Sequence, residues 1–166
     1  HLSTEAYAVQ DDNESNADTY GYLYNWYAVN DSRGVCPEGW HVPDDDDFKQ
    51  LEIYLGMSQA EADTFGYRGT NEGGKLKESG HEHWEYYSDE TTEGATNESG
   101  FTALPGGSRN ENNGVYTSMG SSGYFWSSTD MGGWVAYSRK LFYEGSGIER
   151  YGKDKQMGSS VRCMKD

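Results

Sequence analysis

The chain of 166 residues contains two cysteines, Cys36 and Cys163, which stand near opposite ends of its patterned sequence. A disulfide between them would close most of the chain into one loop. Under a chain-entropy treatment, such a bridge stabilises the folded state by about 5 kcal/mol. Small, acidic, glycine-rich chains are typical of the extracellular space, where disulfides persist. The sequence therefore predicts a bridge between Cys36 and Cys163, with two buried free thiols as the alternative.

The apolar surface available for a core comes largely from aromatic residues. Only 34% of the residues are hydrophobic, yet the chain has 5 Trp and 14 Tyr, which bury apolar area while their polar edges reach water. This indicates a folded, loop-rich domain rather than a disordered chain.

The net charge of -15 disfavours nucleic acid as a partner, because phosphate binding needs clustered cations. No apolar stretch is long enough to span a membrane.

The length is that of one domain. Residues 1–19 are polar and acidic and show no periodicity, so we expect an N-terminal arm followed by a domain over residues 20–166. Residues Tyr20–Val29 alternate aromatic and aliphatic side chains, which predicts a strand or a tightly packed buried segment.

Helix signals come early in the chain and strand signals come late. Asp44 is a good N-cap for a helix over Asp45–Leu55, which has acidic residues in its first turn, where the helix dipole favours them. Capping-box spacing over Ser58–Glu61 predicts a second, shorter helix over Gln59–Phe65. Later apolar pieces such as Trp134–Tyr143 predict short strands between long ordered loops. The fold class is therefore α+β.

Six ordered blocks are distributed along the sequence from Tyr20 to Asp166. They are Tyr20–Tyr27 (YGYLYNWY), Cys36–Pro43 (CPEGWHVP), Gly74–Lys77 (GKLK), Asn97–Gly107 (NESGFTALPGG), Phe125–Thr129 (FWSST) and Ser160–Asp166 (SVRCMKD). Together they resemble the domain family named after the major paralogues of Fibrobacter succinogenes, which is common in secreted bacterial proteins. The chain departs from this family at Ser159, where relatives often carry an aromatic residue.

The resemblance implies a C-type-lectin-like fold of the formylglycine-generating-enzyme type, with two short helices, a small twisted antiparallel sheet and long ordered loops. In that fold the N- and C-terminal strands lie close together, which would bring Cys36 and Cys163 within reach of each other. Variable proteins of diversity-generating retroelements share the fold, and their ligand-facing residues precede the last strand. By this resemblance, the ligand-facing segment here is Trp134–Lys155.

The composition of this segment suits a recognition surface, because Tyr and Arg combine large, rigid area with hydrogen bonds. Residues 137–166 hold seven basic and four acidic residues and so carry a net charge of +3. Because the whole chain has a net charge of -15, the remaining residues carry -18. This asymmetry favours an anionic partner or a second copy of the chain. Within the segment, Glu149–Lys155 is polar and aromatic and is expected to form a loop. An ordinary solvated hairpin with incidental charges is the alternative. The predicted ligand-binding residues are Trp134, Tyr137, Arg139, Tyr143, Arg150, Tyr151 and Lys153.

Metal and catalytic sites are weaker hypotheses. The acidic runs Asp11–Asp12 and Asp44–Asp47 lack the spacing of a dedicated calcium loop, so calcium is only an alternative to a cofactor-free domain. His81 and His83 could ligate zinc, but no third ligand is evident, and we expect a structural role. His41 is expected to satisfy buried backbone groups. There is no nucleophile motif or nucleotide loop, and bridged cysteines would leave no reactive thiol.

These observations predict an extracellular or cell-surface, non-enzymatic binding module, such as an adhesin. It would recognise a protein or an anionic glycan through its C-terminal surface, without a cofactor or catalytic residues. The alternative is a structural subunit of an extracellular fibre or surface layer. In that case the basic surface of one copy would meet the acidic body of the next.

Overall fold

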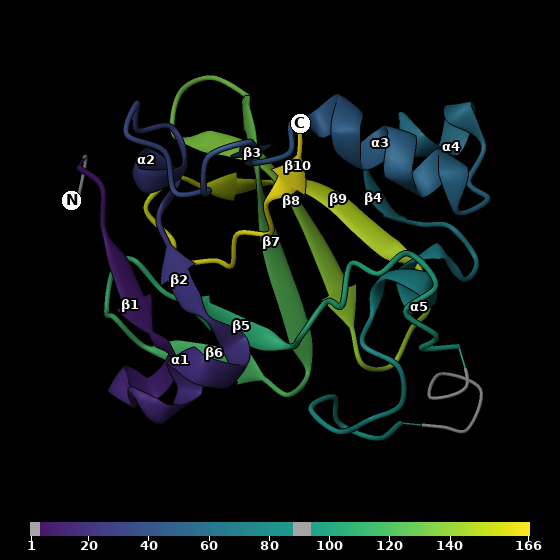
Figure 1. Ribbon diagram of the computed structural model, residues 1–166, viewed down its shortest axis with the longest axis horizontal. Helices are drawn as coiled ribbons and strands as arrows, with labels where there is room; N and C mark the ends of the chain where they lie inside the picture. The colour runs from purple at the N-terminus through teal and green to yellow at the C-terminus, as the bar shows by residue number, and fades with distance from the viewer. Residues whose placement is uncertain (1–3, 88–93) are drawn as a thin grey trace.

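The structure is a computed structural model that describes residues 4–87 and 94–166 (Figure 1). Its largest element is a six-stranded sheet. In spatial order the strands are β4 (Gly66–Arg68), β9 (Ile148–Asp154), β8 (Val135–Phe142), β7 (Ser122–Asp130), β5 (Gly106–Arg109) and β6 (Tyr116–Met119). Neighbouring strands are antiparallel, except that β5 runs parallel to β7. The class is therefore α+β, as predicted.

The sheet is larger than the predicted small antiparallel sheet, because two of its strands lack the apolar alternation by which strands are recognised. β5 reads GGSR, and β9 reads IERYGKD with Arg150 and Lys153 at buried positions. The expected loop over Glu149–Lys155 is thus wrong. This stretch forms most of an inner strand, which lies between β4 and β8.

The N-terminal segment forms regular structure. It contains β1 (Tyr7–Val9), the 3-10 helix η1 (Gln10–Asp12), α1 (Ser15–Tyr20), β2 (Tyr22–Tyr24) and α2 (Trp26–Val29). β1 and β2 form an antiparallel pair. Asn25, the N-cap of α2, accepts hydrogen bonds from the N–H groups of Ala6 at 3.0 Å and Ala28 at 3.1 Å. The stretch Tyr20–Val29, predicted as a strand or buried segment, is therefore part strand and part helix.

The two ends of the domain are joined by a second small sheet, in which β3 (Trp40–His41) pairs with β10 (Met164–Lys165). Cys36 and Cys163 flank this pair with a Cα–Cα distance of 5.8 Å, and they form the predicted disulfide. The expectation for His41 is wrong. Its half-exposed ring contacts two carboxylates, with Nδ1 2.7 Å from Asp166 Oδ1 and Nε2 3.2 Å from Asp47 Oδ2, rather than buried backbone groups.

Local capping signals predict the start of two helices well. α3 (Asp45–Tyr54) begins with a capping box in which the side chains of Asp44 and Asp47 each accept a hydrogen bond from the other's N–H group. The acidic run Asp44–Asp47 therefore serves the start of the helix, as expected. α4 (Gln59–Ala62) has the predicted capping box as well, but it ends at Ala62 rather than Phe65.

The described residues form more than the two predicted helices. α5 (Glu72–Leu76) contains Gly73 and Gly74, which lower helix propensity and hide the helix from sequence analysis. Close packing explains these glycines, since a Cβ added at Gly73 would lie 2.1 Å from the carbonyl oxygen of Gly147. None of the helices in the described part of the chain is long and apolar enough to cross a membrane.

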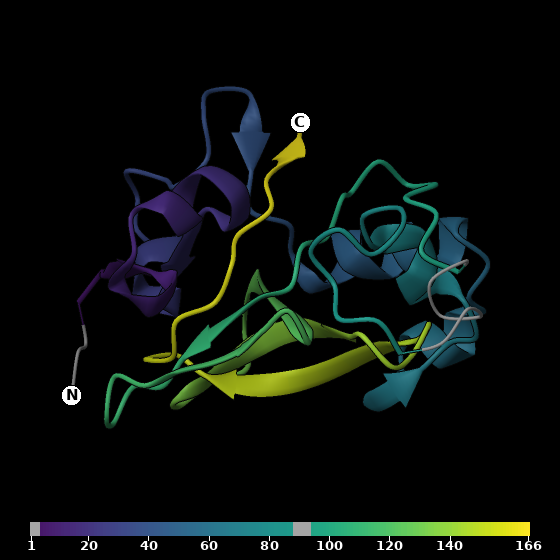
Figure 2. The same ribbon diagram turned by 90° about the horizontal axis from the view of Figure 1, so that it is seen from below.

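Two separate cores pack on β7, because consecutive residues of a strand point to opposite faces. Phe125 belongs to the larger core with Phe48 of α3, whereas Trp126 belongs to a smaller core with Trp26 of α2. Figure 1 shows α3, α4 and α5 at one end of the molecule and β1, β2 and α1 at the other. In the view of Figure 2, the large sheet passes beneath both groups.

Candidate functional site

Arg139 and Arg150, two of the predicted ligand-binding residues, lie inside the protein. Arg139 is only 2% exposed, and its Nη1 lies 2.8 Å from Asp45 Oδ1 while its Nε lies 2.7 Å from Glu52 Oε1. Arg150 forms an ion pair with the same aspartate, with its Nη2 2.6 Å from Asp45 Oδ2. Asp45 and Glu52 stand about two turns apart on α3. The two arginines therefore attach this helix to β8 and β9.

Arg68 of β4 extends the network, with its Nη2 2.5 Å from Glu52 Oε2. Burial by itself would raise the pKa of Asp45, but the hydrogen bond from Arg150 and the charge of Arg139 outweigh it, so the pKa is lowered. Such a network is structural, because removing one charge leaves its partner buried and unpaired. The expected surface position of Arg139 and Arg150 is therefore wrong.

Lys153 is also buried, with 3% of its surface exposed. Its Nζ lies 3.8 Å from the centroid of the Tyr124 ring, and the described residues offer this nitrogen no hydrogen-bond partner. Burial, and then the charge of Lys140, lower the pKa of Lys153 to about 7. Burial likewise raises the pKa of the neighbouring Tyr151. Lys153 thus contacts an aromatic interior, which corrects its expected place on the surface.

The remaining predicted residues differ in exposure. Tyr137 is half-buried, with its ring 5.7 Å from that of Phe65, and Tyr143 is half-buried, with its ring 5.7 Å from that of Tyr87. Trp134 is 67% exposed and is alone among the seven predicted residues in lying mainly on the surface. Ligand binding by this segment stays a prediction, and Trp134 is the residue around which a site can be sought.

Trp134 borders a pocket of about 270 Å³ beside the end of β9 and the start of β8. Asp154 and Gln156 line it from the end of β9 and the residues after it. Glu111 and Asn112 line it from the turn between β5 and β6. The pocket therefore combines an exposed indole with carboxylate and amide groups from segments that are far apart in the sequence.

The turn that carries Trp134 is held in place by contacts with Lys155. The buried Lys155 places its Nζ 2.6 Å from Asp130 Oδ1 and donates to the carbonyl oxygen of Gly133 at 3.0 Å. Its backbone N–H donates to the carbonyl oxygen of Trp134 at 2.9 Å. Gly132 and Gly133 have φ values of 90° and 57°, which glycine adopts without strain. The indole is thus presented by a preformed turn.

The opposite wall of the pocket is ordered by side-chain contacts within its own turn. Asn110 accepts hydrogen bonds from the N–H groups of Asn112 at 2.9 Å and Asn113 at 3.3 Å. Asn112 Nδ2 donates to Glu111 Oε1 at 2.5 Å. The other oxygen of Glu111 is buried and has no hydrogen-bond partner among the residues that the structure describes. The charge of Glu111 acts on the buried Lys153, whose pKa it raises against the effect of burial.

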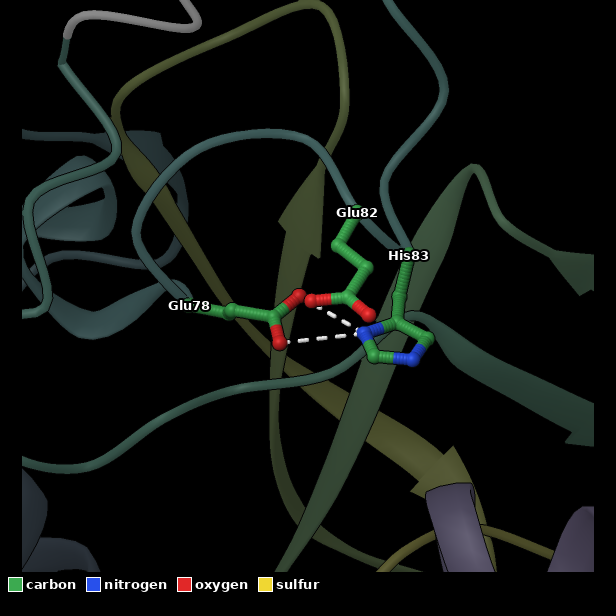
Figure 3. Close-up of side chains that lie close together, drawn as sticks. All are labelled: Glu78, Glu82 and His83. Carbon is green, nitrogen blue, oxygen red and sulfur yellow. Dashed lines mark hydrogen bonds and ion pairs between the residues drawn. The ribbon is translucent and has the colours of Figure 1, made fainter.

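His83, one of the two histidines considered for zinc, lies beside two carboxylates (Figure 3). Its Nδ1 is 2.9 Å and 3.0 Å from the two oxygens of Glu78, and Glu82 brings a ligand atom within 4.8 Å of both. One nitrogen and two carboxylates are ligand types that zinc accepts. His81 points elsewhere and packs its ring against Tyr86 at 6.0 Å. In this structure His83 and Glu78 are hydrogen-bonded to each other.

The sequence matches the family model described as the Fibrobacter succinogenes major domain over residues 1–165. The chain belongs to this family. Comparison with curated proteins and with solved structures gives no match. The match to the Fibrobacter succinogenes major domain includes residues 1–19, which sequence analysis set apart as an arm.

The first and last of the six sequence blocks lie side by side in the structure. The first block contributes Tyr24, whose N–H donates to the carbonyl oxygen of Ser159 at 2.7 Å, while the Ser159 N–H donates back at 2.9 Å. Ser159 is fully buried, so its small side chain is part of the packing between these two segments. The last block then continues to Cys163 and the disulfide.

Proposed function

We propose that this protein is an extracellular, non-enzymatic binding module and that the Trp134 pocket holds a hydroxyl-rich ligand such as a glycan. The exposed indole of Trp134 carries the proposal. A flat aromatic ring packs against the apolar face of a sugar, and carboxylate and amide groups beside it exchange hydrogen bonds with hydroxyl groups. Glu111, Asn112 and Asp154 supply such groups around the indole.

The polar walls of the pocket favour a neutral ligand over an anionic one. Sequence analysis favoured an anion because of the basic residues after position 137, but Arg139, Arg150 and Lys153 are buried. The titratable groups that line the pocket are the carboxylates Glu111 and Asp154. Burial of these three cations also weakens the case for the alternative, self-association into a fibre, which depended on a basic surface.

The extracellular location and the fold type belong to the same proposal. The Cys36–Cys163 disulfide supports an oxidising compartment. Both cysteines of the chain are in this bridge, so neither is available for thiol chemistry. The disulfide-linked pair of β3 and β10 supports a C-type-lectin-like fold, in which the two ends of the domain meet.

Binding to a glycan array, followed by titration calorimetry with the best glycan, tests the proposal. We expect Trp134→Ala to weaken binding by about 2 kcal/mol, roughly thirty-fold, as for a central aromatic contact. Tyr54→Ala is the matched control, because Tyr54 is an exposed aromatic residue on α3, 82% exposed and outside the pocket. Equal affinities of wild type and Trp134→Ala would refute the site, and a preference for sulfated or sialylated glycans would refute the neutral ligand.

A further inference from the structure

A second pocket, of about 410 Å³, lies at the opposite ends of β8 and β9 from Trp134. Its walls combine three aromatic rings with two carboxylates. They are Tyr67, Tyr87, Phe142, Glu144, Gly145 and Glu149. This composition differs from that of the Trp134 pocket, because the side chains of this pocket include no amide.

The register of the sheet explains how these groups come together. Tyr67 of β4 pairs with Glu149 of β9, and Glu149 pairs with Lys140 of β8. Residues paired in this way lie on one face of a sheet. Phe142 follows Lys140 by two positions on the same strand and so shares that face. The aromatic and acidic side chains therefore converge on the face opposite the buried Arg150.

The aromatic walls are fixed in the absence of a ligand. The Tyr67 hydroxyl accepts a hydrogen bond from the N–H of Gly147 at 2.8 Å, and its ring meets Phe142 edge-on at a centroid distance of 5.9 Å. A Cβ added at Gly145 would lie 2.4 Å from the same hydroxyl, so glycine is required for this approach. Tyr67 remains 55% exposed, which leaves its ring open to a ligand.

The turn after β8, which carries Glu144, is pinned by a buried lysine. Lys77 Nζ donates hydrogen bonds to the carbonyl oxygens of Phe142 and Gly145, the latter at 2.7 Å. Its own position is fixed by the Trp84 ring, whose centroid lies 4.8 Å from Nζ. The carboxylate of Glu144 is thus attached to a rigid turn.

Within the described residues, neither Glu144 nor Glu149 forms an ion pair or a side-chain hydrogen bond. The pocket therefore offers negative charge and the negative faces of aromatic rings. Lys140 places its Nζ 4.0 Å from the Phe142 centroid, so one ring already holds a cation, but two carboxylates outweigh this single charge. The overall charge of -15 adds attraction for cations.

We propose that this pocket binds an organic cation of the quaternary ammonium or alkylated amine class. Such a cation gains attraction from ring faces and from carboxylates at once, and its methyl groups fill an aromatic cavity that a hydrated metal ion would not. This site is separate from the Trp134 pocket and does not depend on the function proposed for it.

Titration calorimetry with choline tests the proposal, with 3,3-dimethyl-1-butanol as the uncharged ligand of the same shape. We expect choline to bind at least tenfold more tightly than the alcohol, and less tightly as salt is added. The double variant Glu144→Gln/Glu149→Gln should lose at least tenfold in choline affinity. Tyr67→Leu should lose a similar amount, whereas Tyr67→Phe, which keeps the ring, should lose less.

Glu111→Gln is the matched control, because it removes a carboxylate from the other pocket. It should leave choline binding unchanged, as should Trp134→Ala. Thermal unfolding of each variant shows that the fold is retained. No binding of choline at millimolar concentrations would overturn the proposal. So would equal binding of the alcohol, or full affinity in the double glutamine variant of a folded protein.

Discussion

Replacing Lys153 by Met should stabilise the protein, and most strongly at acidic pH. At pH 6 the ammonium is charged in the folded and the unfolded chain, so the folded state bears the full cost of burying it. The pKa falls from 10.5 to about 7. At about 1.4 kcal/mol per pH unit, this amounts to about 5 kcal/mol as an upper bound on the gain in the free energy of unfolding. Met fills a similar volume and packs well against Tyr124.

The pH dependence of this gain follows from proton binding. Because the folded pKa lies below the unfolded one, the unfolded chain keeps the Lys153 proton between pH 7 and about pH 10 while the folded chain loses it. Stability therefore rises with pH in this window. The wild type should gain about 2 kcal/mol from this residue between pH 7 and pH 9, because the folded form is still half protonated at pH 7, and Lys153→Met should not. Lys77, whose pKa is lowered by burial to about 8, contributes equally to both proteins and cancels.

Urea unfolding followed by Trp fluorescence at pH 6 and pH 9, with the disulfide intact, measures both effects. Lys165→Met is the matched control, because Lys165 is exposed, and its substitution should change stability by less than about 0.5 kcal/mol. A Lys153→Met protein that is less stable than the wild type at pH 6 would refute the reasoning. A stabilisation of the same size at both pH values would refute the assigned origin in the buried charge.

Two further outcomes are expected. Asp45→Asn should destabilise the protein by about 3 to 5 kcal/mol in urea unfolding, because it leaves two buried arginines without their shared carboxylate, whereas the exposed Asp46→Asn should have little effect. Hydrogen bonding to Asp166 raises the pKa of His41, so its stabilising charge is present below pH 6.5 and is lost as the pH rises through the raised value. His41→Gln should therefore lower the midpoint of thermal unfolding at pH 5 more than at pH 8, and an equal change at both would contradict this.

Local signals in the sequence predicted those parts of the fold that local physics determines. The start of α3 depends on Asp44 and Asp47, which are three positions apart and satisfy each other's N–H groups. The blocks around Cys36 and Cys163 indicated the family and, with it, the pairing of the chain ends. β9 was missed because its buried positions hold Arg150 and Lys153, and a charged residue in a sequence predicts solvent exposure.

The residues that line the two pockets could not be grouped from the sequence. The family resemblance pointed to Trp134, but nothing in the sequence linked this residue to Glu111 and Asn112, because they belong to a turn between two other strands. The acidic aromatic pocket was missed for the same reason, since Tyr67 and Glu149 become neighbours only through the pairing of β4 with β9.

By itself, the sequence determined the family, the α+β class, the starts of α3 and α4 and the disulfide, because each depends on short-range patterns or on blocks that keep their order. The tertiary structure decided which charges reach solvent. Arg139 pairs with Glu52, which is 87 residues away in the sequence, and Arg150 pairs with Asp45, which is 105 residues away. A cation is buried when a carboxylate from a distant segment compensates for its lost hydration. That partner cannot be identified from the cation's own neighbours in the chain.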